Sequence, residues 1–177
     1  TNNVANTTMG GAISSLGEVI TNNAKFINNT AKTTGGAISS IGNVNITKSE
    51  FDKNNATSYG GAVYVESGII VSESNFNNNT AGTGGAIFSN NNTVTVIVDG
   101  SSFTGNNATS SGGAIYSNGK VETTNVDFTL NNATSYGGAI FSNNTVITTG
   151  GNFNNNSATL SGGAIYSNNE VTTISGN

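Results

Sequence analysis

The sequence contains no cysteine, no histidine and no proline. Without cysteine, disulfides cannot indicate the redox compartment, and without cysteine or histidine the usual ligands of a zinc site are missing. Proline interrupts hydrogen-bonded ladders because it has no backbone N–H. Its absence therefore suits a chain in which nearly every backbone N–H has a partner.

Charged residues make up only 8% of the 177 residues, there is no arginine, and the formal net charge is −4. Phosphate contacts require clustered lysine or arginine, so we expect no nucleic-acid partner. The apolar runs are too short to cross a bilayer, so we predict no membrane span in this segment. Low charge with abundant Asn, Ser and Gly is typical of disorder, but the regular spacing of apolar residues contradicts disorder.

Two short phrases recur along the chain in a common register. Gly-Gly-Ala followed by Ile or Val occurs seven times, about 25 residues apart, and phenylalanine followed three residues later by asparagine occurs six times. The glycine phrases begin at Gly10, Gly35, Gly60, Gly84, Gly112, Gly137 and Gly162. The second phrases pair Phe26 with Asn29, Phe51 with Asn54, Phe76 with Asn79, Phe103 with Asn106, Phe128 with Asn131 and Phe153 with Asn156. Together they define a repeating structural unit.

Each repeat contains the patterns of three short strands. β-Branched residues alternate with polar ones before each phenylalanine, the Gly-Gly-Ala phrase carries a second strand, and the phenylalanine lies on a third strand or bend. Such a unit cannot bury its own apolar face, but stacked copies can pair in parallel and in register. The sequence thus predicts an all-β fold, a parallel β-helix of about seven coils, with three short strands per coil. At about 4.8 Å per coil the rod is roughly 33 Å long.

The repeats extend over the whole chain, so we expect one β-helix domain spanning residues 1–177. The sequence opens and closes in mid-repeat, and we interpret it as a fragment of a longer surface protein. One coil departs from the regular length, because about three residues are inserted around 89–93. Insertions in solenoids map to surface loops, so this coil is predicted to carry a protrusion.

The phenylalanine and asparagine positions predict two ladders along the rod. We expect the phenylalanines to form a buried column, and the asparagines to hydrogen-bond to each other and to backbone groups at a sharp bend. The glycine pairs are expected to allow a positive φ at the opposite corner and to let the backbones of adjacent coils approach closely.

The acidic residues do not form a pattern suited to catalysis. Polysaccharide lyases and hydrolases with β-helix folds require clustered or facing carboxylates. Here the nine acidic residues are scattered over different columns of the repeat. We therefore expect no enzyme activity, no catalytic or metal site and no cofactor.

An aromatic column follows the Gly-Gly-Ala phrase in the last five coils. Its members are Tyr64, Phe88, Tyr116, Phe141 and Tyr166, and serine occupies the same position in the first two coils. If the preceding aliphatic residue points inward, strand alternation directs the aromatic residue outward. A large exposed apolar patch of this kind is typical of an interaction site. The inverse arrangement, with the aromatic residue inward and the aliphatic residue outward, remains open.

The two phrases in fixed register resemble the repeats of the polymorphic outer-membrane proteins of chlamydiae, over the full length of the chain. Similar repeats occur in adhesin-like surface proteins of methanogenic archaea, and the Asn and Thr richness resembles the latter. The resemblance implies a right-handed parallel β-helix, displayed at the extracellular cell surface and used in adhesion.

We therefore predict a non-enzymatic adhesin or stalk segment that binds through the aromatic column or through turns. Its expected partner is a protein or glycan on a host or neighbouring cell, or another copy of the chain. Two alternatives stay open. One is a structural subunit of an extracellular fibre formed by end-to-end stacking, and the other is a polysaccharide-binding or carbohydrate-active β-helix.

Overall fold

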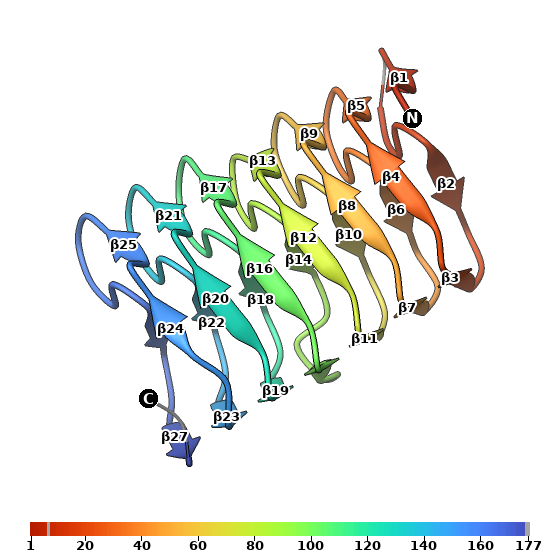
Figure 1. Ribbon diagram of the computed structural model, residues 1–177. Helices are drawn as coiled ribbons and strands as arrows, with labels where there is room; N and C mark the ends of the chain where they lie inside the picture. The colour runs from red at the N-terminus through yellow and green to blue at the C-terminus, as the bar shows by residue number, and fades with distance from the viewer. Residues whose placement is uncertain (7, 176–177) are drawn as a thin grey trace.

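The computed structural model describes residues 1–6 and 8–175, and they form a parallel β-solenoid. Seven coils stack side by side into a rod, with the two ends of the chain at opposite ends (Figure 1). Every strand pairs in parallel with its copy one coil away, which produces four parallel sheets. The expected bounds of the domain, 1–177, include residues 7 and 176–177, which lie outside the described residues.

The Gly-Gly-Ala sheet contains the strands that follow the glycine pairs. Its strands are β2 (Ile13–Ser15), β6 (Ile38–Ser40), β10 (Val63–Val65), β14 (Ile87–Ser89), β18 (Ile115–Ser117), β22 (Ile140–Ser142) and β26 (Ile165–Ser167). Ile or Val stands first in each strand, and in the inner coils it is fully buried.

The Val-Thr sheet contains the strands in which β-branched residues alternate with polar ones. Its strands are β3 (Val19–Asn22), β7 (Val44–Thr47), β11 (Ile69–Ser72), β15 (Val96–Asp99), β19 (Val121–Thr124), β23 (Val146–Thr149) and β27 (Val171–Ile174). Buried and more accessible positions alternate along these strands, as expected for a sheet with one face on the core.

The Phe sheet contains six strands, each with a phenylalanine. They are β4 (Lys25–Ile27), β8 (Glu50–Asp52), β12 (Asn75–Asn77), β16 (Ser102–Thr104), β20 (Asp127–Thr129) and β24 (Phe153–Asn154). The register places Lys25 beside Glu50, and their side chains form an ion pair of 2.8 Å. In this pair the hydrogen bond and charge of Glu50 raise the pKa of Lys25.

The fourth sheet, the Asn-Ala sheet, corrects the expectation of three strands per coil. Its strands are β1 (Val4–Ala5), β5 (Thr30–Ala31), β9 (Asn55–Ala56), β13 (Thr80–Ala81), β17 (Asn107–Ala108), β21 (Asn132–Ala133) and β25 (Ser157–Ala158). Two residues are too few to show an alternating pattern in the sequence. The strands become recognisable only because each pairs with its copy in the next coil.

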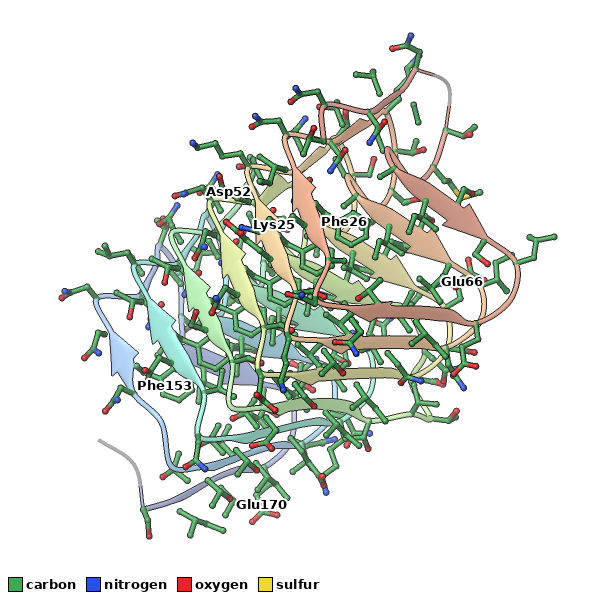
Figure 2. The ribbon with its side chains drawn as sticks, turned by 45° about the vertical axis from the view of Figure 1, so that its right-hand side comes forward. Lys25, Phe26, Asp52, Glu66, Phe153 and Glu170 are labelled. Carbon is green, nitrogen blue, oxygen red and sulfur yellow. The ribbon has the colours of Figure 1, made fainter. Side chains whose placement is uncertain are left out.

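The core is a set of stacked columns inside the rod. The phenylalanines form a Phe ladder, whose ring centroids lie 4.6–5.1 Å apart with nearly parallel planes. Figure 2 labels its first and last members, Phe26 and Phe153. The centroid spacing follows the strand spacing of about 4.8 Å, so in-register pairing dictates the stacking of the rings. Phe51, Phe76, Phe103 and Phe128 have no exposed surface.

The asparagines form an Asn ladder inside the bend that follows the Phe sheet. The side-chain oxygen of Asn79 accepts hydrogen bonds from the backbone N–H and the side-chain amide of Asn54, both 2.9 Å long. The amide of Asn79 donates to the backbone oxygen of Phe51 and to the side-chain oxygen of Asn106. Each inner rung repeats this pattern, so the amides satisfy backbone groups that the bend leaves without a sheet partner.

The paired glycines have separate structural roles, as Gly60 and Gly61 show. Gly60 has a φ of +63°, a backbone conformation that residues other than glycine rarely adopt. Gly61 lies against the next coil, where an added Cβ would be 2.0 Å from the backbone oxygen of Gly85. The first glycine therefore makes the turn, and the second allows adjacent coils to approach.

We predict that Gly61→Ala lowers the free energy of unfolding by more than about 3 kcal/mol, because the new methyl group meets backbone atoms that cannot move without separating two coils. Gly17→Ala is the matched control. A Cβ at Gly17 has no neighbour within 4 Å, so that variant should keep its stability to within about 0.5 kcal/mol. Urea unfolding followed by circular dichroism measures both, and equal midpoints would contradict the close approach of the coils.

For the Asn ladder we predict that Asn79→Ala costs about 3 kcal/mol or more, since it leaves several buried polar groups without partners. The same substitution at Asn55, whose side chain is exposed, should change stability by less than about 0.5 kcal/mol. The two urea midpoints provide the comparison. A midpoint for Asn79→Ala equal to that of the Asn55 control would show that the ladder contributes nothing to stability.

Candidate ligand-binding groove

The aromatic stripe, defined as Tyr64, Phe88, Tyr116, Phe141 and Tyr166, lies on the outer face of the Gly-Gly-Ala sheet. Each ring belongs to the middle residue of its strand. The preceding aliphatic residue, such as Ile87 before Phe88, belongs to the buried core cluster, whereas the rings do not. The inverse arrangement, with the rings in the core, therefore does not occur.

The rings of the aromatic stripe stack on one another along the rod. Neighbouring centroids lie 4.6–5.7 Å apart, and the ring planes are within 10° of parallel. Because the ring faces point along the rod toward each other, the stripe presents mainly ring edges and the tyrosine hydroxyls to the outside. Ring edges carry the positive side of the aromatic quadrupole and so favour contact with oxygen atoms.

The stripe is more covered than the sequence led us to expect. Phe88 is only 6% exposed and Tyr64 and Phe141 are 8% exposed, so the expectation of a large exposed apolar patch is wrong for these rings. One cause is the mutual stacking of the rings. The other is a second set of side chains that packs over the stripe from one side.

This second set contains Tyr59 and Tyr136, which the sequence reasoning missed. Tyr59 lies 4.6 Å from Phe88 with its ring tilted by 45°, and Tyr136 lies 4.8 Å from Tyr166 with a tilt of 42°. Both occupy the position just before the Gly-Gly pair, where neighbouring coils have smaller residues such as Thr83. Both tyrosines occupy the same position of the repeat, and this shared position was the sequence signal that could have revealed them.

Asparagines form the opposite side and make a polar rim. The rim consists of Asn90, Asn118, Asn143 and Asn168, each two residues after an aromatic ring. Each amide after that of Asn90 donates to the side-chain oxygen of the preceding member, over 3.2, 2.8 and 2.7 Å in turn. Asn143 also donates to the hydroxyl of Tyr116 at 3.1 Å, which connects the rim to the stripe.

Between the two sides lies a groove of about 700 Å³ that extends over the last five coils. The aromatic stripe forms its floor. Its sides are formed by Tyr59 and Tyr136 and by three members of the polar rim, Asn90, Asn118 and Asn168. The residues that line it carry no formal charge. It begins only at the third coil because Ser14 and Ser39 take the place of the rings in the first two coils.

A single carboxylate stands beside the N-terminal end of the groove. Glu66 accepts a hydrogen bond of 3.0 Å from the hydroxyl of Tyr64, and Figure 2 labels its position. Burial, together with this hydrogen bond and the charge of Glu66, raises the pKa of Tyr64 to about 12. Tyr64 is therefore a neutral hydrogen-bond donor at physiological pH.

The inserted residues enlarge the turn between β14 and β15, as the sequence predicts. Six residues, 90–95, connect these strands, whereas three residues, 66–68, connect β10 and β11. Beside the rim this turn forms a second hollow of about 560 Å³, which we call the amide pocket. The amide pocket is lined by five asparagines, namely Asn90, Asn92, Asn118, Asn143 and Asn144.

The described residues contain no cluster of side chains suited to binding a metal ion. No group of three or more His, Cys, Asp or Glu side chains lies close enough to hold a metal ion within the part of the chain that the structure covers. The same residues include no helix of sufficient length and apolarity to pass through a bilayer. The chemistry that the groove offers is neutral hydrogen bonding and aromatic contact.

Fold and groove together define a parallel β-solenoid repeat protein with a groove along one outer face. The model of the Chlamydia polymorphic membrane protein repeat matches residues 20–41, 48–66, 73–90, 100–118, 125–143 and 152–168, which is more than half of the chain. The chain belongs to this repeat family, which is a family of non-enzymatic surface proteins. Searches of curated proteins and of solved structures return no match.

The family match separates the possibilities that the sequence left open. It bears out the resemblance to the chlamydial repeats, whereas the resemblance to archaeal adhesin-like proteins receives no support. Neither a fibre subunit nor a polysaccharide-binding or carbohydrate-active β-helix is favoured by it.

The elevated pKa of Tyr64 yields a prediction for alkaline solution. Its folded-state value of about 12 lies above the ordinary value of 10.0, so its contribution to stability is complete below about pH 10 and is lost as the pH rises toward about 12. In an ultraviolet absorbance titration of the folded protein, Tyr64→Phe should remove the tyrosine transition near pH 12. Tyr166→Phe is the control and should leave that transition in place. Loss of an earlier transition in Tyr64→Phe would contradict the packing around Glu66.

Proposed function

We propose that the chain is a surface-exposed passenger segment of an outer-membrane protein and acts as an adhesin, holding a partner on another cell in the groove. The observation that carries the proposal is the continuous groove along the outer face of five coils, with five stacked rings as its floor. Membership of a family of non-enzymatic surface proteins supports an extracellular location.

The scaffold favours this role physically. Every strand of the Gly-Gly-Ala sheet pairs with its copies on both sides in the inner coils, so the floor of the groove is held by a hydrogen-bonded ladder rather than by mobile loops. A site placed on rigid elements loses little conformational entropy when it binds. A solenoid also lengthens its binding face with each added coil.

Tyr59 and Tyr136 are the best positions for a test, because they cover the stripe from outside and lie beyond the core. Tyr59 is 43% exposed, so its removal should disturb the fold little. The matched control replaces Ile20 and Ile70, which are 70% and 47% exposed on the outer face of the Val-Thr sheet.

We predict that the double variant Tyr59→Ala and Tyr136→Ala binds to cultured epithelial cells at least about tenfold more weakly than the unchanged chain, because aromatic anchors dominate binding energy in most interfaces. Flow cytometry with the labelled chain measures this binding, and circular dichroism checks the melting temperature. The Ile20→Ala and Ile70→Ala control should bind like the unchanged chain. Equal loss in both variants, or loss in neither, would refute the groove as the adhesive site.

A further inference from the structure

We propose that the partner held in the groove is a neutral, unbranched glycan that lies along the rod axis, with about one pyranose unit per coil. The inference rests on the proposed function, because it names the chemical class that the same groove binds.

Charge favours a neutral ligand over an anionic one. The lining of the groove carries no formal charge, and the chain as a whole has a net charge of −4. Glu66 places a further carboxylate beside the end of the groove, next to Tyr64. A sulfated or sialylated chain would meet this negative potential without a lysine in the lining to offset it.

The spacing of the groove favours a glycan over an extended peptide. The stripe repeats once per coil, and its centroids are 4.6–5.7 Å apart. An extended peptide presents side chains on one face only every 6.6 to 6.8 Å or so, so it would lose register within a few coils. A pyranose unit in an extended chain advances by about one coil, so each coil can contact one unit. Successive units of a β-1,4 chain are turned by about half a turn, so like faces meet like contacts at every second coil.

Backbone pairing also argues against a peptide. A peptide commonly binds a sheet by adding a strand at a free edge. The groove lies across the face of the Gly-Gly-Ala sheet, and the backbones of β14, β18 and β22 are engaged by neighbours on both sides. Contacts in the groove must therefore come from side chains.

The side chains supply the two kinds of contact that a pyranose ring requires. Tyr59 and Tyr136 are tilted by 45° and 42° from the rings they cover, so their faces are turned differently from those of the stripe and can stack on the C–H face of a sugar. The asparagine rim supplies a side-chain carbonyl acceptor once per coil, because each of these oxygens accepts at most one bond within the rim. The amide of Asn143 is already engaged, since it donates to both Asn118 and Tyr116. Adjacent sugar hydroxyls are both donors and acceptors, and so complement an amide.

The amide pocket adds a place where one sugar can be distinguished from another. It shares Asn90 and Asn118 with the groove and extends outward through Asn92. A substituent on a sugar near the fourth coil would enter it, and the asparagine amides there can pair with the carbonyl oxygen and the N–H of an acetamido group, a combination that a hydroxyl does not offer. Selectivity between sugars therefore arises at the fourth coil, which carries the insertion.

The first experiment is isothermal titration calorimetry of the full chain with cellohexaose, with chitohexaose as the N-acetylated probe and a heparin hexasaccharide as the anionic probe. We expect saturable binding of at least one neutral probe and binding of the heparin probe at least about tenfold weaker. Absence of binding to both neutral probes, or equal binding of heparin, would overturn the proposal.

The variants locate the site. Tyr59→Ala with Tyr136→Ala should weaken binding of the neutral probe about tenfold, and the Ile20→Ala with Ile70→Ala control should leave it unchanged. Deletion of residues 92–94 shortens the turn of the fourth coil to Ser-Asn-Asn-Thr-Val. Residues 142–146 have this same sequence and form a regular turn in the sixth coil. It should abolish the preference between cellohexaose and chitohexaose. A preference that persists would overturn the role of the amide pocket.

A third measurement distinguishes failure of the inference from failure of the proposed function. Cell binding that depends on Tyr59 and Tyr136 but survives enzymatic removal of cell-surface glycans would support adhesion through the groove and overturn the glycan. Self-association in analytical ultracentrifugation that the tyrosine variant abolishes would assign the groove to a second copy, and would also overturn the glycan. Cell binding unaffected by the tyrosine variant would refute both proposals.

Discussion

The structure depends on one constraint: each strand pairs in parallel with its own copy one coil away, with no slip in register. This pairing places like residues on top of like, at the spacing between neighbouring strands. The Phe ladder and the Asn ladder follow directly from it. A core of stacked rings and self-paired amides explains how a chain with so few apolar residues acquires an ordered interior.

The same constraint organises the outer surface. An aromatic residue that recurs at the outward position of successive strands necessarily becomes a stripe, and an asparagine two residues later becomes a rim. The shape of the groove then comes from the positions that depart from strict repetition. The serines of the first two coils mark where the groove starts, Tyr59 and Tyr136 cover the stripe at intervals, and the insertion before β15 adds the amide pocket.

Most of the fold could be predicted from the sequence because its strongest signals are periodic. Gly35 and Gly60 are 25 residues apart, and so are Phe51 and Phe76. This constant spacing predicts that each coil pairs in parallel and in register with the next, as the strands do. The Asn-Ala sheet was not predicted, because its two-residue strands show no alternation. Their strand character arises from the pairing of one coil with the next.

The groove was only partly predictable for a related reason. The position of Phe88 in a strand was sufficient to place its ring outside the core, because alternation along a strand is a local property. The packing of Tyr59 over Phe88 joins residues from different coils across a glycine turn, and local alternation cannot reveal it. The sequence therefore indicated which residues line the surface, whereas the depth and sides of the groove required the three-dimensional arrangement.

The most direct test of the account is a map of the residues that a ligand contacts. In a nitrogen-15 spectrum of the full chain, titration with chitohexaose is predicted to shift the side-chain amide signals of Asn90, Asn118, Asn143 and Asn168. The buried amides of the Asn ladder, such as Asn79, should stay unchanged. Shifts confined to the Val-Thr sheet, or no shift in the rim at saturating probe, would contradict the assignment of the groove as the binding site.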